Sequence, residues 1–440
     1  MGALDNHNEV MHQMQAASLT LERVIARRGS LSTIMPEYEG RLPAQRVPKY
    51  KELCFGSCRW FYRIQSIINQ LVERPLKDNE IRVRAILTVA IYQLLETNTP
   101  DHAVVNEAVD IARKLNKPWA KGLINALLRE CIRSRRSLSK EDGQYRHAHN
   151  PWFLEKIQTL YPDNWAQIIK ANNHRPPLCL RVNLRRIKRE NYLAMLGDQN
   201  VSAHASPFLP SAVYLTTPMP VNSIPGFRDG LVSVQDEGAQ LAGYLLNLEK
   251  NDRCLDACSA PGGKAGHLLE MEPSIHLVAL EWKERKLGAI ASNMARLKVY
   301  AHLQQGDATN LDWWDGRQYD AILIDAPCSG SGVVRRHPDI KILLEQQQVD
   351  ENRAIQRQML QQLWQTLRAE GKMLYCTCSI FPEENEEIIE EFTTTCGNAE
   401  VEPISLPEGI PQHKTANGVQ LLPSMSANDG FYFSLLKKTD

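Results

Sequence analysis

Apolar and polar residues alternate with a helical period over the first third of the chain. Between residues 14 and 138, apolar side chains recur every three or four positions, which is the spacing that places them on one face of an α-helix. The clearest of these faces lie at residues 81–92, 104–115 and 119–131, and Asp78 is the expected N-cap of the first. Because only short polar segments separate them, the pattern predicts a compact all-α domain.

The pattern changes at about residue 231, where short apolar runs alternate with amphipathic helical stretches. The runs predict strands at 253–257, 276–280, 302–306, 319–325 and 372–377, and the stretches predict helices at 264–271, 283–298 and 350–369. Such alternation is typical of βαβ units and a parallel sheet. The carboxyl ends of the strands should meet in one crevice, where open α/β sheets bind ligands. The last apolar run, at 431–437, is expected to add an edge strand.

A basic segment lies between these two regions. Alternating apolar residues from Leu178 to Leu184 predict a strand, whose opposite face and following turn should carry the basic side chains. Those side chains are Arg181, Arg185, Arg186, Lys188 and Arg189. The segment predicts a small α/β subdomain with a cationic surface.

Composition and charge narrow the class of protein. The chain has 440 residues, of which 43% are hydrophobic and 23% are charged, which excludes a disordered or collagen-like chain and allows roughly two to four domains. The formal net charge is zero, yet residues 1–190 carry 31 Lys and Arg against 19 Asp and Glu, and residues 191–440 carry 20 against 32. The basic first part predicts contact with a polyanion, because phosphates bind Lys and Arg with release of counterions.

The ten cysteines include no CxxC pair, a usage that fits free thiols in a reducing compartment. The first residues lack the basic and apolar run of a leader peptide, and no uninterrupted apolar segment approaches the roughly 18 residues of a membrane helix. The sequence therefore predicts a cytoplasmic protein without membrane contact. Cys54/Cys58 and Cys254/Cys258 are CxxxC pairs without a second ligand pair at finger spacing, so we expect no metal site.

A glycine-rich loop follows the first strand of the predicted sheet. In LDACSAPGGKAGHLLE the strand ends near Asp256, and Pro261 and two glycines precede a helix, so that the backbone can approach a ligand closely. The loop is neither a Walker A motif nor GxGxxG. Glu281 ends the next strand and follows the glycines by about 20 residues. At this distance along the chain, a carboxylate can accept hydrogen bonds from the two hydroxyls of a ribose. Asp307, which follows the strand after that, could accept from an adenine amino group; the series predicts an adenosyl cofactor.

Two cysteines follow the last two strands of the predicted parallel sheet. Asp325 and Cys328 lie at the end of one strand in IDAPCSGSG, and Cys378 ends the next in LYCTCSIF. If these strands are neighbours, both thiols face one pocket. Carbon-5 of cytosine is a poor nucleophile until a thiolate adds to carbon-6, a covalent activation that requires a reactive cysteine. A second thiol can then assist loss of the carbon-5 proton, and a carboxylate can stabilise the adduct.

These motifs resemble those of a known family. CSAPGGK, DAPCSGSGVVRRHPDIK and the TCS of YCTCSIFPEEN are similar to the motifs of the RsmB/NOP family of RNA cytosine carbon-5 methyltransferases, and ELCFGSCRW, IYQLL and KGLINALLR resemble its NusB-type RNA-binding domain. The resemblance covers nearly the whole chain. It implies an all-α NusB-like domain over 1–145, a small basic α/β subdomain that contacts RNA over 146–230, and a class I, Rossmann-like α/β methyltransferase domain over 231–440.

The same resemblance implies a reaction and a set of partners. S-adenosyl-L-methionine is the implied methyl donor, and the implied target is a cytosine in 16S rRNA, either free or in an early 30S particle; we expect a monomer. In the family the TCS cysteine, here Cys378, is the nucleophile, and the PC cysteine, here Cys328, assists product release. The implied cofactor positions are Cys258, Ser259, Ala260, Pro261, Gly262, Gly263, Lys264, Glu281, Asp307 and Asp325.

Several alternatives stay open at this point. The roles of Cys328 and Cys378 could be reversed, although the presence of the TCS motif argues against it. The target could be a cytosine at another rRNA site or in transfer RNA. From a different class of protein, a non-catalytic NusB-like RNA-binding factor would also fit the helical domain, but the intact Cys328, Cys378 and Asp325 disfavour it. The missing GxGxxG motif counts against a dehydrogenase.

Overall fold

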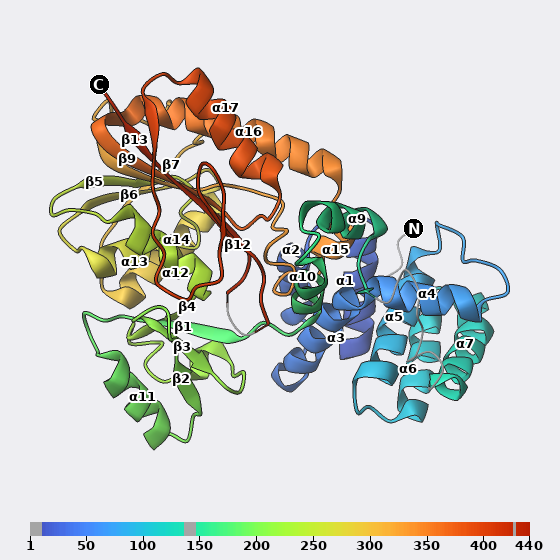
Figure 1. Cartoon of the computed structure of the whole chain (residues 1–440). Coiled ribbons are helices and arrows are strands. Elements are labelled where there is room, and N and C mark those ends of the chain that lie inside the picture. The colour runs from blue at the N-terminus through green and yellow to red at the C-terminus, as the bar shows by residue number, and fades with distance from the viewer. Residues whose placement is uncertain (1–10, 136–146, 426–427) are drawn as a thin grey trace, which may run out of the picture. The chain divides into compact units, whose positions relative to one another are not determined.

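The computed structural model describes residues 11–135, 147–425 and 428–440. The chain divides into two compact units (Figure 1): the first comprises residues 1–175 and 334–345, and the second comprises residues 176–333 and 346–440. The predicted boundary between residues 145 and 146 lies outside the described residues, and the predicted division into three domains stays a prediction.

The first unit consists of helices, and those from α1 to α7 surround one continuous apolar core. The helices are α1 (Gln13–Ile25), α2 (Leu31–Glu39), α3 (Val47–Arg59), α4 (Phe61–Leu71), α5 (Ile81–Glu96), α6 (Asp101–Lys114), α7 (Lys121–Arg133), α9 (Pro151–Leu160), α10 (Trp165–Asn173) and α15 (Ile340–Leu343). α5 lies at the centre, because most of its side chains are buried and it packs against α1, α3, α6 and α7. The all-α domain predicted from the hydrophobic period is confirmed.

Two details of the helical prediction are wrong. Asp78 does not cap α5: the backbone of Lys77 to Glu80 closes a turn first, and Glu80 is the residue before the helix. Trp119 was expected on the buried face of the third helix but is 55% exposed. It lies in the short 3-10 turn Pro118–Ala120, and α7 begins only after that turn.

A segment from the cysteine motif region, residues 334–345, belongs to the helical unit. Asp339 Oδ2 accepts from the backbone N–H of Leu31 at 2.9 Å, and Lys341 Nζ donates to the carbonyl oxygens of Arg59 at 2.8 Å and Ala148 at 3.1 Å, and to Asn173 Oδ1. Ile342 lies in the apolar core of the helices. The second half of the sequence DAPCSGSGVVRRHPDIK is therefore a structural anchor rather than part of the sheet edge.

The second unit begins with a small antiparallel sheet in the order β2-β3-β1-β4. Its elements are β1 (Leu178–Val182), α11 (Arg189–Asp198), β2 (Ala203–Ala205), β3 (Ala212–Leu215) and β4 (Val232–Val234). The predicted small α/β subdomain is confirmed. The prediction of its exposed basic side chains is wrong at one position. Arg181 is 1% exposed, because its guanidinium forms a bidentate ion pair with Glu270 at 2.9 and 3.0 Å.

The remainder of this unit is a nine-stranded mixed sheet in the order β11-β12-β13-β9-β8-β5-β6-β7, with β10 paired to β13. The strands are β5 (Arg253–Asp256), β6 (His276–Glu281), β7 (His302–Gln305), β8 (Tyr319–Asp325), β9 (Leu367–Thr377), β10 (Ala399–Glu402), β11 (His413–Lys414), β12 (Val419–Leu421) and β13 (Phe431–Lys438). The five predicted strands are confirmed and pair in parallel. The run at 431–437 is not an edge strand, since β13 pairs with β9 on one side and with β10 and β12 on the other.

Helices cover both faces of this sheet. Figure 1 shows α16 (Gln346–Thr366) and α17 (Glu386–Thr395) on one face, and α12 (Glu237–Leu246), α13 (Gly263–Met271) and α14 (Glu284–Leu297) on the other. Met359 and Leu363 of α16 and Phe392 of α17 pack on sheet residues such as Ile322 and Tyr375. Burial on both faces explains why the central strands are continuous apolar runs in the sequence.

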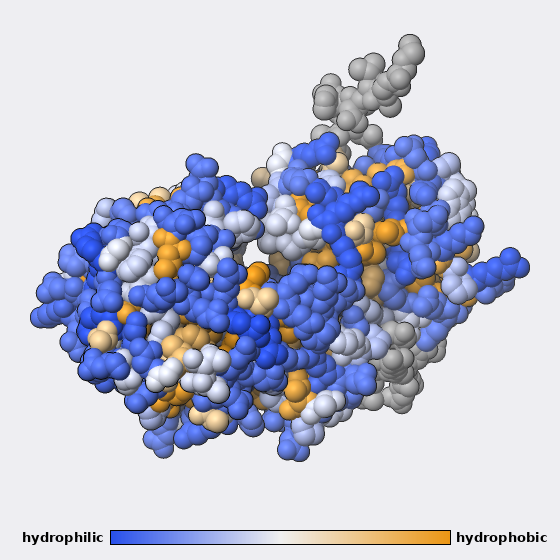
Figure 2. All heavy atoms as spheres, turned by 90° about the horizontal axis from the view of Figure 1, so that it is seen from above, coloured by the Kyte–Doolittle hydropathy of each residue, from blue (hydrophilic) through white to orange (hydrophobic). Residues whose placement is uncertain are grey.

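Hydrophilic residues predominate on the face of the molecule seen in Figure 2, with hydrophobic ones scattered in small groups. No helix in the described part of the chain is both long enough and apolar enough to span a bilayer. The described residues also contain no cluster of three or more His, Cys, Asp or Glu side chains that could hold a metal ion.

We predict that Lys341→Met destabilises the helical unit. The substitution removes the hydrogen bonds of the ammonium group and leaves buried oxygen acceptors without a donor, so the free energy of unfolding should fall by about 2–4 kcal/mol. Denaturant titration followed by circular dichroism measures the change. The control Lys51→Met removes a solvent-exposed pair with Glu39 and should cost less than about 1 kcal/mol; equal effects for the two variants would contradict the role of Lys341 as an anchor.

Candidate active site

The glycine loop (residues 258–264) connects the carboxyl end of β5 to the first turn of α13. Gly262 has φ +91°, a left-handed conformation that L side chains rarely adopt. A Cβ on Gly262 would also lie 3.1 Å from Met294. At Gly263 the nearest atom to a Cβ would be Gln235 Nε2 at 4.0 Å, so this side of the loop is open. The first turn of a helix has backbone N–H groups without a partner inside the helix, so the start of α13 is suited to an anionic group of a ligand.

The carboxyl ends of β8, β5, β6 and β7 are neighbours at one edge of the large sheet. The backbone N–H of Ser259 donates to the carbonyl of Leu280 at 3.0 Å, and the N–H of Gly306 donates to the carbonyl of Glu281 at 3.3 Å. These bonds place the glycine loop beside Glu281, and Glu281 beside the end of β7, where Asp307 follows. β8, which ends at Asp325, pairs with β5 on the other side. The structure thus brings together the sequence-predicted cofactor residues.

Glu281 and Asp307 differ in their environments. Glu281 is 4% exposed, accepts from the N–H of Lys283 at 3.1 Å, and lies 3.9 Å from Lys286 Nζ. Asp307 is exposed, and its Oδ1 accepts from the N–H of Thr309 at 2.9 Å and from its hydroxyl at 2.8 Å. Both retain a second carboxylate oxygen with which to accept a hydrogen bond from a ligand.

Two buried polar side chains beside the glycine loop lack a well-aligned hydrogen bond. Among the described residues, the carboxylate of Asp256 and the hydroxyl of Ser259 have no partner in good geometry, although Ser259 and the backbone of Cys258 lie close enough to Asp256 to offset part of the rise in its pKa. Burial, together with the nearby Asp325 carboxylate, raises the pKa of Asp256 to about 7. Since buried polar groups are normally paired, these atoms indicate that a ligand with hydrogen-bonding groups completes the site. The residues therefore fit an adenosyl cofactor with a charged amino-acid moiety.

Asp325 is held by two neighbours at the end of β8. Lys264 Nζ donates to Oδ2 at 2.6 Å, and Cys376 Sγ donates to Oδ1 at 3.7 Å. Burial alone would lower the pKa of the Lys264 ammonium, but the adjacent Asp325 carboxylate raises it above its usual value. Burial, followed by the Asp325 charge, raises the pKa of the Cys376 thiol. Cys376 is therefore a protonated, buried donor to Asp325 and does not pair with Cys378.

Two other thiols at this edge, Cys328 and Cys378, form the thiol pair, with their sulfur atoms 3.4 Å apart. Both are half-buried. β8 and β9 run parallel with Asp325 opposite Cys376, and the N–H of Gly332 donates to the carbonyl of Cys378 at 2.9 Å. The hydrogen bond to Cys378 is the largest cause of a pKa of Cys328 well above the usual value; burial and the charges of Cys378 and Glu384 add to it. The two cysteines therefore lie side by side at neighbouring strand ends, and a shared pocket stays a prediction.

Glu384 is a site residue that the sequence analysis missed. Its Oε1 accepts from the N–H of Ser329 at 2.7 Å and from Asn352 Nδ2 at 3.2 Å, and its Oε2 accepts from the hydroxyl of Ser329 at 2.5 Å. Burial raises the pKa of Glu384. The carboxylate thus fixes the backbone next to Cys328. In the sequence, Glu384 stands in the acidic run PEENEE, which looks like an exposed helix start; only its nearness to the TCS motif could have singled it out.

Three stretches of the chain match known families. Residues 9–133 match the NusB family, residues 149–222 match a ferredoxin-like domain described as RsmF/B-like, and residues 243–437 match the family described as 16S rRNA methyltransferase RsmB/F. The chain is also 40% identical over 438 residues to the probable ribosomal RNA small subunit methyltransferase B of Coxiella burnetii, a match that covers 97% of this chain and 100% of that protein. The chain belongs to the RsmB/F family of 16S rRNA methyltransferases.

A second relative agrees with this assignment, and two solved structures share the fold. The ribosomal RNA small subunit methyltransferase B of Pasteurella multocida is 40% identical over 430 residues, with 96% of this chain and 95% of that protein covered. The crystal structure of PH0851 matches with a TM-score of 0.80 at 20% identity, covering 97% of this chain and 99% of that one. NSun6 from Pyrococcus horikoshii with SFG matches with a TM-score of 0.58 at 20% identity, covering 66% and 98%.

RsmB/F membership fixes the class of activity. The chain is an S-adenosylmethionine-dependent rRNA methyltransferase. The resemblance inferred from the motifs is confirmed, as is the fold class: a NusB-like helical domain, a small α/β subdomain and a Rossmann-like methyltransferase domain. The two solved structures, at 20% identity, support the fold alone.

We predict that Asp256 makes the second unit less stable as the pH rises. The unfolded-state pKa is about 3.9 and the folded-state value is about 7, so between these values the folded state binds the additional proton. The free energy of unfolding should therefore fall with rising pH, by up to about 1.4 kcal/mol per pH unit.

Denaturant titrations from pH 4.5 to pH 7.5 test this dependence. Asp256→Asn should flatten the profile of the second unit, whereas the control Asp312→Asn, which replaces an exposed aspartate, should keep the wild-type profile. Because burial lowers the pKa of His267 in the same unit, which has the opposite effect on stability, the test is the difference between the variants. An Asp256→Asn profile that matches the wild-type profile would show that the buried carboxylate is not protonated in this way.

Proposed function

We propose that the chain transfers a methyl group from S-adenosyl-L-methionine to carbon-5 of a cytosine in 16S rRNA, through a covalent adduct between Cys378 and the base. The observation that supports this most directly is the 3.4 Å contact between the sulfur atoms of Cys378 and Cys328 at the carboxyl ends of two adjacent strands. A methyltransferase acting on an amino group or a hydroxyl has no use for a pair of thiols, because those acceptors need no covalent activation.

When bound, S-adenosyl-L-methionine supplies an electrophilic methyl group. The residues that would hold it are the glycine loop, Glu281, Asp307 and Asp325. Glu281 would accept from the ribose hydroxyls, Asp307 from the adenine amino group, and the first turn of α13 would face the carboxylate of the methionine moiety. The carboxylate oxygens of Asp256 and the hydroxyl of Ser259 would complete their hydrogen bonds in the loaded enzyme.

The family resemblance of the TCS motif marks Cys378 as the nucleophile. The 3.4 Å contact between the sulfur atoms allows the Cys328 thiol to donate a hydrogen bond to Cys378 Sγ, which would stabilise negative charge on that sulfur as it attacks the base. The Cys378 sulfur then forms a bond to carbon-6, and the electron pair of the carbon-5/carbon-6 double bond becomes available at carbon-5. Asp325, fixed by Lys264 and Cys376, would hydrogen-bond the ring nitrogen or amino group of the base.

Product release uses the second thiol. Cys328 lies beside the Cys378 sulfur and therefore close to the base in the adduct. After losing its own proton to water, the Cys328 thiolate can take the proton from carbon-5. The electron pair of that carbon–hydrogen bond restores the double bond, and the bond between carbon-6 and Cys378 breaks with its electrons returning to sulfur.

The principal test is methyl transfer from labelled S-adenosyl-L-methionine to unmodified RNA. Small-subunit rRNA, presented free and in an early 30S particle, should accept label at carbon-5 of one cytosine, as shown by nucleoside analysis; transfer RNA should accept none. Label in transfer RNA, or at another rRNA position only, would select one of the alternative substrates. Label on an atom other than carbon-5 would contradict the reaction. The monomeric state and the cytoplasmic location stay predictions.

Cysteine variants separate the roles of the two thiols. Cys378→Ala should lose at least about 10³-fold in turnover, because the base is no longer activated. Cys328→Ala should still attack but release product slowly, so a protein–RNA adduct should accumulate on a denaturing gel. Cys396→Ala, which removes another half-buried thiol of the same unit, should turn over normally and show no adduct. An adduct in Cys378→Ala and none in Cys328→Ala would reverse the assignment.

A further inference from the structure

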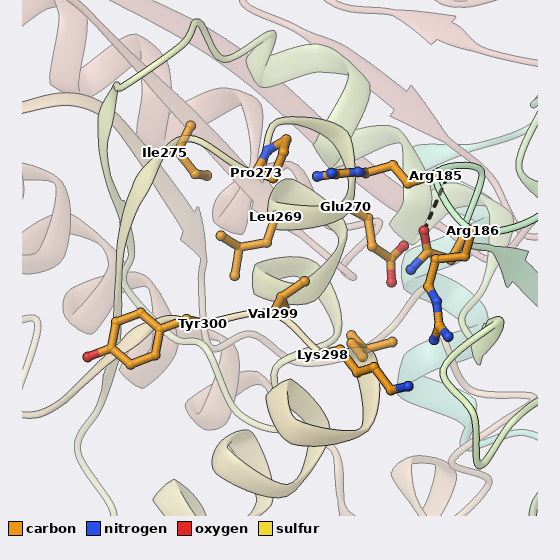
Figure 3. Close-up of a pocket in the computed structure, with 11 residues that line it drawn as sticks. Arg185, Arg186, Leu269, Glu270, Pro273, Ile275, Lys298, Val299 and Tyr300 are labelled. Carbon is orange, nitrogen blue, oxygen red and sulfur yellow. Dashed lines mark hydrogen bonds between the residues drawn. The ribbon is translucent and has the colours of Figure 1, made fainter.

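A basic cavity of about 450 Å³ lies in the second unit, between the small antiparallel sheet and the helices of the methyltransferase domain. It is lined by Asn183, Arg185, Arg186, Leu269, Glu270, Pro273, Ile275, Leu297, Lys298, Val299 and Tyr300. Figure 3 shows that these side chains come from the turn after β1, from the end of α13 and from the segment between α14 and β7. None of them belongs to the candidate active site.

The cavity and the thiol pair lie at opposite ends of the large sheet. Ile275 comes directly before β6, and Tyr300 comes shortly before β7, whereas the active-site residues follow the carboxyl ends of the strands. β6 has six residues, so at about 3.3 Å per residue the two ends are about 20 Å apart. A strand of RNA with stacked bases covers this distance in about six nucleotides.

The charge of the cavity is strongly positive. Arg185, Arg186 and Lys298 are exposed, and among the described residues none of the three forms an ion pair. The carboxylate of Glu270 is already neutralised, because Arg181 holds both of its oxygens at 2.9 and 3.0 Å. The buried Arg181–Glu270 pair therefore leaves three cations at the surface of the cavity, a number suited to successive phosphates.

An exposed aromatic ring lies at the opposite side of the cavity from these cations (Figure 3). Tyr300 is 80% exposed, and in Figure 3 its ring points outward, away from the other lining residues. A large aromatic side chain in open solvent gains nothing for folding. Nucleic-acid-binding proteins use such rings to stack bases, and combine them with cations that follow the phosphates.

We propose that this cavity binds single-stranded RNA on one side of the target cytosine, with Arg185, Arg186 and Lys298 contacting phosphates and Tyr300 stacking on a base. The proposal rests on the proposed function, since it takes the RNA substrate as the ligand. It differs from the sequence-based expectation in two respects: Arg181 has no part in RNA contact, and the cationic surface is completed by residues of the methyltransferase domain.

Binding measurements on the full-length protein test the site. The triple variant Arg185→Gln/Arg186→Gln/Lys298→Gln should bind in vitro transcribed small-subunit rRNA at least about tenfold more weakly, and the slope of log Kd against log salt should fall by about 2–3. The matched control Arg317→Gln/Arg368→Gln/Lys437→Gln removes three exposed cations of the same unit that are paired with carboxylates. The control should retain most of the wild-type slope.

The tyrosine is tested separately, in case the triple variant folds poorly. Tyr300→Ala should weaken binding at least about fivefold, and Tyr300→Phe should restore it, because stacking needs the ring and not the hydroxyl.

An unchanged Kd and salt slope in both the triple variant and Tyr300→Ala would overturn the proposal. Because binding is measured without methyl transfer, its outcome is independent of the proposed reaction. A protein that binds rRNA through the cavity but methylates none would contradict the proposed function and not this site.

Discussion

The parallel pairing of β8 with β9 is the constraint on which the active site depends. The register sets Asp325 opposite Cys376, so the residues that follow both strands, Cys328 and Cys378, emerge at the same edge with their sulfur atoms 3.4 Å apart. A shift of register by one residue would turn the side chains to the opposite face of the sheet. The helices on both faces bury these strands and hold the register.

Two ion pairs between buried or half-buried side chains connect the parts of the site. Lys264 links the glycine loop to Asp325 at the end of β8. Arg181 links β1 of the small sheet to Glu270 of α13 and, through the carbonyl of Gly263 at 2.9 Å, to the first turn of the same helix. Removing one partner of such a pair leaves an uncompensated buried charge. The small subdomain therefore has a structural role at the cofactor edge in addition to its exposed cations.

The sequence was sufficient to predict most of the architecture, because periodicity reports which faces are buried. The helical faces of the first unit and the five parallel strands follow directly from it. The position of a strand within the sheet does not follow from periodicity. β13 looks like any half-buried strand, and its place between β9 and β12 depends on long-range pairing. Arg181 shows the same limit, since a basic residue in a strand is normally exposed, and only the distant Glu270 allows it to be buried.

For the site, motifs located the thiols, the glycine loop and the strand-end carboxylates, which lie where local sequence places them. The sequence could not reveal residues whose role comes from packing. Glu384 supports Ser329 across 55 residues, and Asp339 and Lys341 bind helices that lie far earlier in the chain. Glu384, Asp339 and Lys341 all lie in or beside recognised motifs. Nearness to a motif therefore indicates that a residue is important, but it does not say whether the residue contacts substrate or stabilises the fold.

The most direct test of the central claim is to identify the cysteine that bonds to the base. RNA that carries 5-fluorocytosine at the target position can be attacked and methylated, but carbon-5 then has no proton to lose, so the adduct should persist. Digestion and mass spectrometry of the trapped complex should find the modified nucleotide on Cys378, with Cys328 still a free thiol. A nucleotide on Cys328, or complete methylation of the normal RNA with no trapped adduct on the fluorinated one, would contradict the assignment of the thiol pair.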